Sequence, residues 1–398
     1  MTYDFIIIGT GIVGLATGLE LNKRYPDKKI LILDKASSLA ADQSGHNSGV
    51  IHSGIYYPPG SLKAQFAAKG CQKMVEFCEE YQVPYRRCGK VIAAVKEKEL
   101  PILNNLYERG LQNGLQLKKL GQEEIKEIEP YLTALAGIYV PNTSVVDFIE
   151  VCKKYAELLK KRNVEIKLGH KVLNIIEEKE HINVETDQGL FVAQWLIACA
   201  GLQSDRLAKL AGCPLTIKIV PFRGEFQKLN SNKNYLVKGL IYPVPDPKLP
   251  FLGVHFSRGV NEVIKIGPNA LLGLAREGYR RGSFNFKDSI EIINYNGFWK
   301  FILKYWQTGL NEWFLSRIKS LYLKQLQAYI PDIRERDIKY YTAGIRAQAL
   351  DNSGNLVNDF YFVEGRRSLH VCNAPSPAAT ASLLIAEYIV NRIEKLFK

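Results

Sequence analysis

The sequence predicts an α/β protein in which a discontinuous nucleotide-binding domain is interleaved with a second, α+β domain. An apolar strand, a glycine-rich turn and a helical pattern open the chain, and strand–helix alternation returns near the middle and at the end. Between the later segments, residues 215–285 alternate in polarity and are punctuated by proline, which is typical of an antiparallel sheet. The 398 residues are enough for two or three domains.

The first of these patterns is a dinucleotide-binding fingerprint at residues 5–14, Phe-Ile-Ile-Ile-Gly-Thr-Gly-Ile-Val-Gly. Gly9 permits the tight turn, Gly11 lets the backbone approach a pyrophosphate, and Gly14 lets the following helix pack closely. The N-terminus of that helix favours the anionic pyrophosphate. Asp34 closes the next apolar run, at the distance where a carboxylate meets ribose hydroxyls. The fingerprint alone does not distinguish FAD from NAD.

Hydrophobic periodicity predicts the elements that follow. The expected helices are 62–81, 97–113, 146–162, 288–327 and 377–397, and the expected strands are 91–95, 164–168, 171–177, 181–187, 195–200, 251–256 and 369–373. The nucleotide-binding pattern therefore occupies three separate segments of the chain. NAD dehydrogenases usually complete this domain contiguously, so the interleaving favours FAD.

We therefore expect two domains. The first is a Rossmann-like FAD-binding domain of residues 1–85, 145–219 and 335–398. The second is a substrate domain of residues 86–144 and 220–334, built on an antiparallel or mixed sheet.

Composition restricts the setting of the protein. No apolar run is long enough for a membrane-spanning helix, and the first strand begins too early to leave room for a signal peptide. The seven cysteines are scattered without metal-ligand spacing, which predicts buried thiols, a reduced cytoplasmic location and no metal site. The net charge of +13 has two equally good explanations. It can reflect lysine-rich surfaces that are simply solvated, or it can attract an anionic substrate, an anionic membrane or a nucleic acid.

A glycine- and serine-rich loop at residues 44–63 carries the most specific signal. Its core, residues 47–57, reads Asn-Ser-Gly-Val-Ile-His-Ser-Gly-Ile-Tyr-Tyr. Here the sequence resembles the L-2-hydroxyglutarate oxidase or dehydrogenase family of the D-amino-acid-oxidase-like FAD superfamily. The resemblance spans the chain and recurs at residues 220–225, 241–247, 253–256, 267–270, 344–348 and 373–378. It implies FAD-dependent oxidation of L-2-hydroxyglutarate to 2-oxoglutarate, with quinone or dioxygen accepting the electrons.

His52 and Arg346 are the candidate catalytic residues. Oxidation of an alcohol must remove the hydroxyl proton, and the imidazole of His52 titrates near neutral pH, although it could instead only brace the loop. The resemblance places Arg346 where related flavin oxidases hold the α-carboxylate, which a guanidinium binds in a bidentate manner. The alternative for Arg346 is a surface salt bridge.

A 2-hydroxy dicarboxylate also needs a site for its distal carboxylate, and the sequence does not single one out. The candidate substrate-binding residues are Tyr56, Tyr57, Lys63, Arg223, Tyr242, His255 and Gln348. Lys63 could equally be a solvated residue of its helix, the tyrosines could be core aromatics, and His255 could be a hydrogen-bonded core histidine.

Cofactor contacts are expected from the fingerprint, the glycine-rich loop, two strand ends and the turn before the last helix. That helix N-terminus would favour negative charge on reduced flavin. The expected cofactor-binding residues are Gly9, Gly11, Ile12, Gly14, Asp34, Lys35, Ser44, His46, Asn47, Ser48, Gly49, Val50, Val172, Ala200, Gly201, Leu202, Ser376, Pro377, Ala378, Ala379 and Thr380.

Residues 298–322 combine aromatic and basic side chains at helical spacing. This pattern suits either a membrane interface on the inner face of the cell membrane or a lid packed on the substrate domain. Two rival functions remain: an amino-acid or amine oxidase of the same superfamily, and a flavin-containing RNA-binding protein. The segment lacks an RNA-binding motif, so we expect no nucleic-acid partner.

Overall fold

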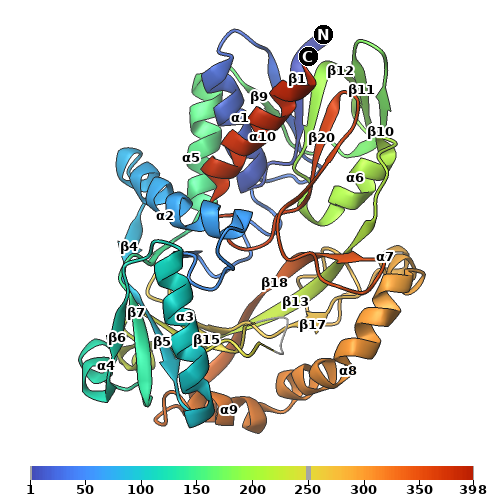
Figure 1. Cartoon of the computed structure of the whole chain (residues 1–398). Helices are drawn as coiled ribbons and strands as arrows, with labels where there is room; N and C mark the ends of the chain where they lie inside the picture. Colours follow the sequence, from blue (N-terminus) through green and yellow to red (C-terminus); the bar gives the residue numbers. More distant parts are fainter. Residues whose placement is uncertain (1, 248–251, 398) are drawn as a thin grey trace.

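The computed structural model describes residues 2–247 and 252–397, arranged as two layered units (Figure 1). The first unit is a mixed sheet with a parallel centre in the order β9-β2-β1-β12-β20. Its strands are β1 (Thr2–Ile8), β2 (Ile30–Leu33), β9 (Glu165–Lys167), β10 (Val172–Glu177), β11 (Ile182–Thr186), β12 (Gly189–Ala198), β19 (Tyr361–Glu364) and β20 (Ser368–Asn373).

Helices cover both faces of this first sheet. One face packs against α1, α5 and α10 through a continuous apolar core, and the other packs against α6. The alternating burial of β1 explains the two cores: Phe5 and Ile7 enter one, while Ile6 and Ile8 enter the other. The helices of this unit are α1 (Ile12–Arg24), α2 (Leu62–Glu80), α5 (Phe148–Lys161), α6 (Ser204–Leu210) and α10 (Ser382–Leu396).

The second unit is a mostly antiparallel sheet, in the order β17-β13-β16-β15-β14-β5-β7-β6, with β18 also paired to β13. Its strands are β5 (Lys90–Ala94), β6 (Lys118–Leu120), β7 (Ala136–Val140), β13 (Ile217–Leu229), β14 (Leu240–Pro243), β15 (His255–Arg258), β16 (Ile264–Gly267), β17 (Leu271–Leu272) and β18 (Ile338–Asp351). Helices α3 (Leu100–Gln112), α4 (Gln122–Ile128), α7 (Phe286–Ile293), α8 (Asn296–Arg317) and α9 (Lys319–Gln327) surround it. A small third sheet joins β3 (Val50–Ile51), β8 (Ser144–Val146) and β4 (Tyr85–Arg87).

The predicted α/β class with a second mixed sheet is confirmed, but several boundaries differ. Strand β18 was assigned to the FAD-binding domain, yet it pairs with β13 along its whole length and so belongs to the second sheet. The last helix begins at Ser382 because residues 376–381 form turns before it. The expected strand at 251–256 begins only at His255, where pairing with β16 begins, and Phe251 lies outside the described residues, as do the chain ends Met1 and Lys398. The division into domains stays a prediction.

The expected long helix at 288–327 is three helices. Asn294 and Tyr295 separate α7 from α8, Ile318 separates α8 from α9, and Tyr305 leaves helical geometry inside α8. Phe298 and Phe301 of α8 bury against Phe222 of β13, which fixes this helix on the second sheet.

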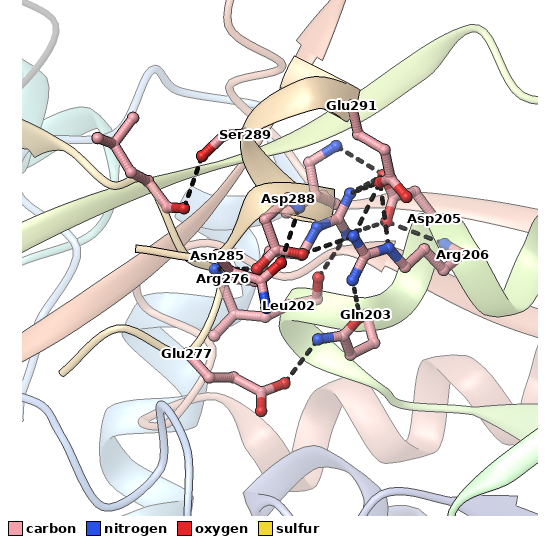
Figure 2. Close-up of polar contacts among 12 residues, drawn as sticks. Leu202, Gln203, Asp205, Arg206, Arg276, Glu277, Asn285, Asp288, Ser289 and Glu291 are labelled. Atoms are coloured by element: carbon pink, nitrogen blue, oxygen red, sulfur yellow. Dashed lines mark hydrogen bonds and ion pairs between the residues drawn. The ribbon is translucent and has the colours of Figure 1, made fainter. Parts of the chain in front are cut away.

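A buried ionic cluster connects the two units (Figure 2). The guanidinium of Arg276, which is 1% exposed, donates to both carboxylate oxygens of Asp205 and to the carbonyl of Leu202 at 2.7 Å. Arg206 of α6 donates to Asp288 of α7 at 2.6 Å and pairs with Glu291. The cluster therefore fixes Arg276 and α7 of the second unit against α6 of the first unit.

Candidate active site

A single cavity of about 1880 Å³ runs along the carboxyl ends of the first parallel sheet and continues to the second sheet. Open α/β sheets bind ligands at this edge. The predicted site residues come from three distant parts of the chain, and all but three of them line this cavity. The three that do not line it are Gly14, Gly49 and Arg223.

At the nucleotide end, the glycines act as the fingerprint predicts. Gly9 has a positive φ of 114°, and a Cβ there would overlap the carbonyl of Cys199. A Cβ at Gly14 would overlap the carbonyl of Gly9, so Gly14 serves close packing of α1. Asp34 accepts hydrogen bonds from the backbone and hydroxyl of Thr10 at 2.6 and 2.7 Å, which fixes the carboxylate at the cavity edge.

The start of α1 suits a pyrophosphate. Its N-cap is Gly11, which supplies no side-chain cap, and helix termini leave backbone N–H groups to be satisfied by other acceptors. The Ile12 N–H donates to the Ser44 hydroxyl at 2.9 Å, which brings the glycine-rich loop against this turn. A glycine-lined cradle, a fixed carboxylate and a helix start whose N-cap residue supplies no side-chain cap together fit a dinucleotide, and they define a dinucleotide-binding α/β enzyme.

Asn47 braces the loop between the two ends of the cavity. Its side chain donates to the Ser44 carbonyl at 2.7 Å and accepts from the Gly49 N–H at 2.8 Å. His46 stacks on Tyr279 of the second unit with ring centroids 4.0 Å apart. Glu277, two residues earlier, pairs with Lys35. These contacts hold the segment 275–279 across the nucleotide end.

His52 lies at the opposite end of the cavity, and its backbone N–H donates to the Thr380 hydroxyl at 3.0 Å. Burial, and after it the positive charges of Lys90 and His255, lowers the pKa of His52 to about 3. Burial likewise lowers the pKa of His255 to about 4, and its ring stacks on Tyr242 with centroids 4.1 Å apart. Both imidazoles are therefore neutral at neutral pH.

Arg346 reaches the same end of the cavity from β18. Its guanidinium donates to the carbonyl of Asn269 at 3.1 Å. Burial lowers the pKa of Arg346 to about 10, against the opposing effect of Glu312, so the side chain stays cationic at neutral pH. Arg346 is thus a half-buried cation that lines the cavity.

The residues predicted to bind the distal carboxylate lie in different surroundings in the structure. Lys63 lies in the first turn of α2 and lines the cavity, and burial lowers its pKa to about 8 against the opposing effect of Asp359. Arg223, in contrast, is paired with Glu225 and donates to the hydroxyl of Tyr340 at 3.0 Å. Alternate residues of a strand face opposite sides, so Arg223 points away from the cavity that Gly224 lines. The structure therefore does not bring Arg223 to the cavity with the other candidates.

The remaining predicted residues are placed as follows. Tyr56, Tyr57, Tyr242 and Gln348 line the cavity, and the hydroxyl of Tyr57 lies 3.3 Å from that of Ser376. His170, which the sequence gave no reason to select, also lines the cavity, close in the chain to Val172. All seven cysteines are free thiols, and Cys372 is buried on β20. Within residues 2–247 and 252–397, no group of three or more potential ligands could hold a metal ion.

Three polar residues near the site escaped sequence reasoning: Lys90, Arg276 and Glu312. Lys90 begins an apolar strand and is 1% exposed, which is unusual for lysine. Glu312 accepts from the N–H of Ala270 at 2.9 Å, and burial raises its pKa. The sequence pattern does not show whether a single lysine or glutamate in an amphipathic segment is buried. Only the packing of the folded chain shows that these side chains lie near the site.

Comparison with known proteins agrees with this class. A family model described as FAD dependent oxidoreductase matches residues 4–392. The L-2-hydroxyglutarate dehydrogenase of Indibacter alkaliphilus is 46% identical, over 97% of each chain. That of Escherichia coli K12 is 42% identical over 99% of this chain and 94% of the relative, and the mitochondrial one of Bos taurus is 43% identical over 100% and 90%.

Solved structures share the fold. The L-alpha-glycerophosphate oxidase of Mycoplasma pneumoniae with FAD bound superposes with a TM-score of 0.80, at 23% identity over 99% of this chain and 95% of the other. Glycine oxidase of Geobacillus kaustophilus gives 0.75, at 17% identity and the same coverage. The chain belongs to the FAD dependent oxidoreductase family and, within it, groups with the L-2-hydroxyglutarate dehydrogenases. The predictions of an oxidoreductase, of FAD and of this family are confirmed.

Proposed function

We propose that this protein oxidises L-2-hydroxyglutarate to 2-oxoglutarate. The observation that supports it most is that one cavity is lined by a neutral imidazole, His52, and by a cation, Arg346. The same cavity carries the dinucleotide residues. The names of relatives at 42–46% identity point to the same substrate.

Each residue has a defined task in this proposal. FAD, held by the fingerprint, Asp34 and the 44–50 loop, supplies the acceptor for the hydride that leaves the substrate carbon. A ring nitrogen of His52 takes the hydroxyl proton, and Arg346 fixes the α-carboxylate in a bidentate manner. The buried walls formed by Tyr56, Tyr57 and Tyr242 limit the access of water.

Anaerobic reduction of the bound flavin tests the substrate. Purified holoenzyme is mixed with L-2-hydroxyglutarate, D-2-hydroxyglutarate, L-glutamate or L-proline, and loss of flavin absorbance is followed. We expect rapid bleaching with the L-hydroxy acid alone. Bleaching by an amino acid, with L-2-hydroxyglutarate inert, would instead support the amino-acid oxidase alternative.

We further propose that α8 contacts a membrane surface and that quinone accepts the electrons there. The outer side of α8 exposes Trp299, Leu303, Trp306, Leu310 and Trp313, at 49–77% of their surface. Lys300, Lys304 and Arg317 lie beside them, and Figure 1 shows the helix at the periphery of the second unit. Aromatic and basic side chains on the exposed side of a helix are typical of helices that bind the surface of an anionic bilayer. Within the described residues, no helix is long and apolar enough to span a membrane.

Sedimentation with anionic liposomes tests this second proposal. A Trp306→Ser/Trp313→Ser variant should lose liposome binding and quinone reduction while keeping anaerobic flavin reduction. If dioxygen reoxidises the reduced flavin faster than quinone in liposomes does, the proposal that quinone is the electron acceptor is rejected. Salt-sensitive binding of RNA without binding of liposomes would support the nucleic-acid alternative.

A further inference from the structure

Lys90 is a buried cation at the substrate end of the protein. It is the first residue of β5, and its side chain is 1% exposed. Its ammonium lies 4.9 Å from the ring centroid of Tyr56 and 5.1 Å from that of Tyr242. None of the ion pairs formed by the described residues involves Lys90. Burying a charge without a partner is costly, so this position requires an explanation.

The titratable groups around Lys90 are neutral or cationic. They come from the loop after β3, from α2, from the turn before β5, and from β14 and β15. The groups are His52, Tyr56, Cys71, Cys88, Tyr242 and His255. Burial lowers the pKa of Lys90 to about 7, against the opposing effect of Cys71 and Cys88. No carboxylate is among these neighbours.

The rings of Tyr56 and Tyr242 line the cavity, whereas Lys90 lies behind them. The hydroxyl of Tyr56 is buried and, among the described atoms, has no hydrogen-bond partner. The ammonium of Lys90 therefore lies next to the two rings that line the cavity.

We propose that Lys90 is the buried countercharge for the distal carboxylate of the substrate and acts on it across the rings of Tyr56 and Tyr242. The α-carboxylate is held by Arg346 at the same end, so the pair of cations selects a dicarboxylate over a monocarboxylate. This inference rests on the proposed function. Lys90 is accordingly a specificity-determining residue that does not itself contact the reacting atoms.

Binding of two product-like ligands to oxidised holoenzyme tests the inference. The dissociation constants of 2-oxoglutarate and of 2-oxopentanoate, which lacks the distal carboxylate, are measured by flavin difference spectra. Lys90→Met should weaken 2-oxoglutarate about 100-fold, equivalent to about 2.7 kcal/mol, and leave 2-oxopentanoate unchanged. The matched control is Lys119→Met, an exposed lysine whose ammonium lies 4.5 Å from the Tyr107 ring.

The pH dependence of selectivity gives a second readout. The ratio of the two dissociation constants cancels effects of pH that are common to both ligands. In wild type the preference for 2-oxoglutarate should fall as pH rises and Lys90 loses its proton, and in Lys90→Arg it should stay constant to higher pH. Thermal melting and flavin content confirm that the variants are folded.

Two results overturn the inference. One is an unchanged dissociation constant of 2-oxoglutarate in Lys90→Met, and the other is equal weakening of both ligands. A failure of the proposed function gives a different result. In that case L-2-hydroxyglutarate would not bleach the flavin of the wild-type protein at all.

Discussion

Replacing Arg276 by methionine should destabilise the junction between the two units. The substitution keeps the length of the side chain but leaves the carboxylate of Asp205, itself 6% exposed, without its guanidinium. Removing one partner of a buried ion pair costs about 3–5 kcal/mol. Asp205 keeps backbone donors at Ile219 and Arg206, at 3.0 and 2.9 Å, so we expect the lower value, about 3 kcal/mol.

This loss can be expressed as a shift of the melting temperature. At about 2.1 cal/mol/K per residue, a chain of 398 residues has an unfolding entropy of about 0.8 kcal/mol/K. The expected shift is therefore about 4 °C, measured by circular dichroism of the holoenzyme. The control is Lys153→Met, which removes an exposed ion pair with Glu150 and should leave the melting temperature almost unchanged.

A double variant makes the reasoning refutable. Adding Asp205→Asn to Arg276→Met removes the uncompensated charge and should recover most of the lost stability. A single variant as stable as the control, or a double variant no more stable than the single one, would show that the buried carboxylate is not the cause.

Three further predictions concern the histidines and Arg346. His52→Ala should lower turnover about 10²–10⁴-fold and retain FAD, as judged by the visible spectrum, and unchanged activity at neutral pH would exclude His52 as the base. Arg346→Lys should raise KM about 10–100-fold because an ammonium cannot reproduce the guanidinium fork, and wild-type kinetics would reject this role. Burial lowers the pKa of His370 to about 4, so between pH 6.5 and 4 the unfolded chain binds a proton that the folded protein does not. Between pH 7 and 5 the wild type should lose about 2 kcal/mol more stability than His370→Leu in urea titrations, and parallel pH profiles would contradict this.

Local patterns were sufficient to predict the nucleotide half of the protein. The fingerprint places strand, turn and helix within residues 2–24, and Gly9, Gly14 and Asp34 act through backbone geometry and short-range contacts. The loop around His52 was found from its resemblance to a known family, which residues 47–57 carry.

The substrate half depended on long-range pairing, and there the sequence was less informative. Strand β18 pairs with β13, more than a hundred residues away, and this register decides that Arg346 faces the cavity while Arg223 faces the opposite side. Periodicity indicates that residues alternate along a strand, but it does not say which side is covered by another element.

The sequence by itself determined the α/β class and the dinucleotide fingerprint, because these depend on neighbours close in the chain. It reached the candidate base His52 and the guanidinium of Arg346 through the resemblance to a known family. Only the tertiary structure showed that His52 and Arg346 share one cavity and that Arg223 is neutralised elsewhere. It also showed that Lys90 is buried behind two tyrosines. The free energy of a charge depends on what surrounds it in space, and those surroundings are assembled from segments far apart in the chain.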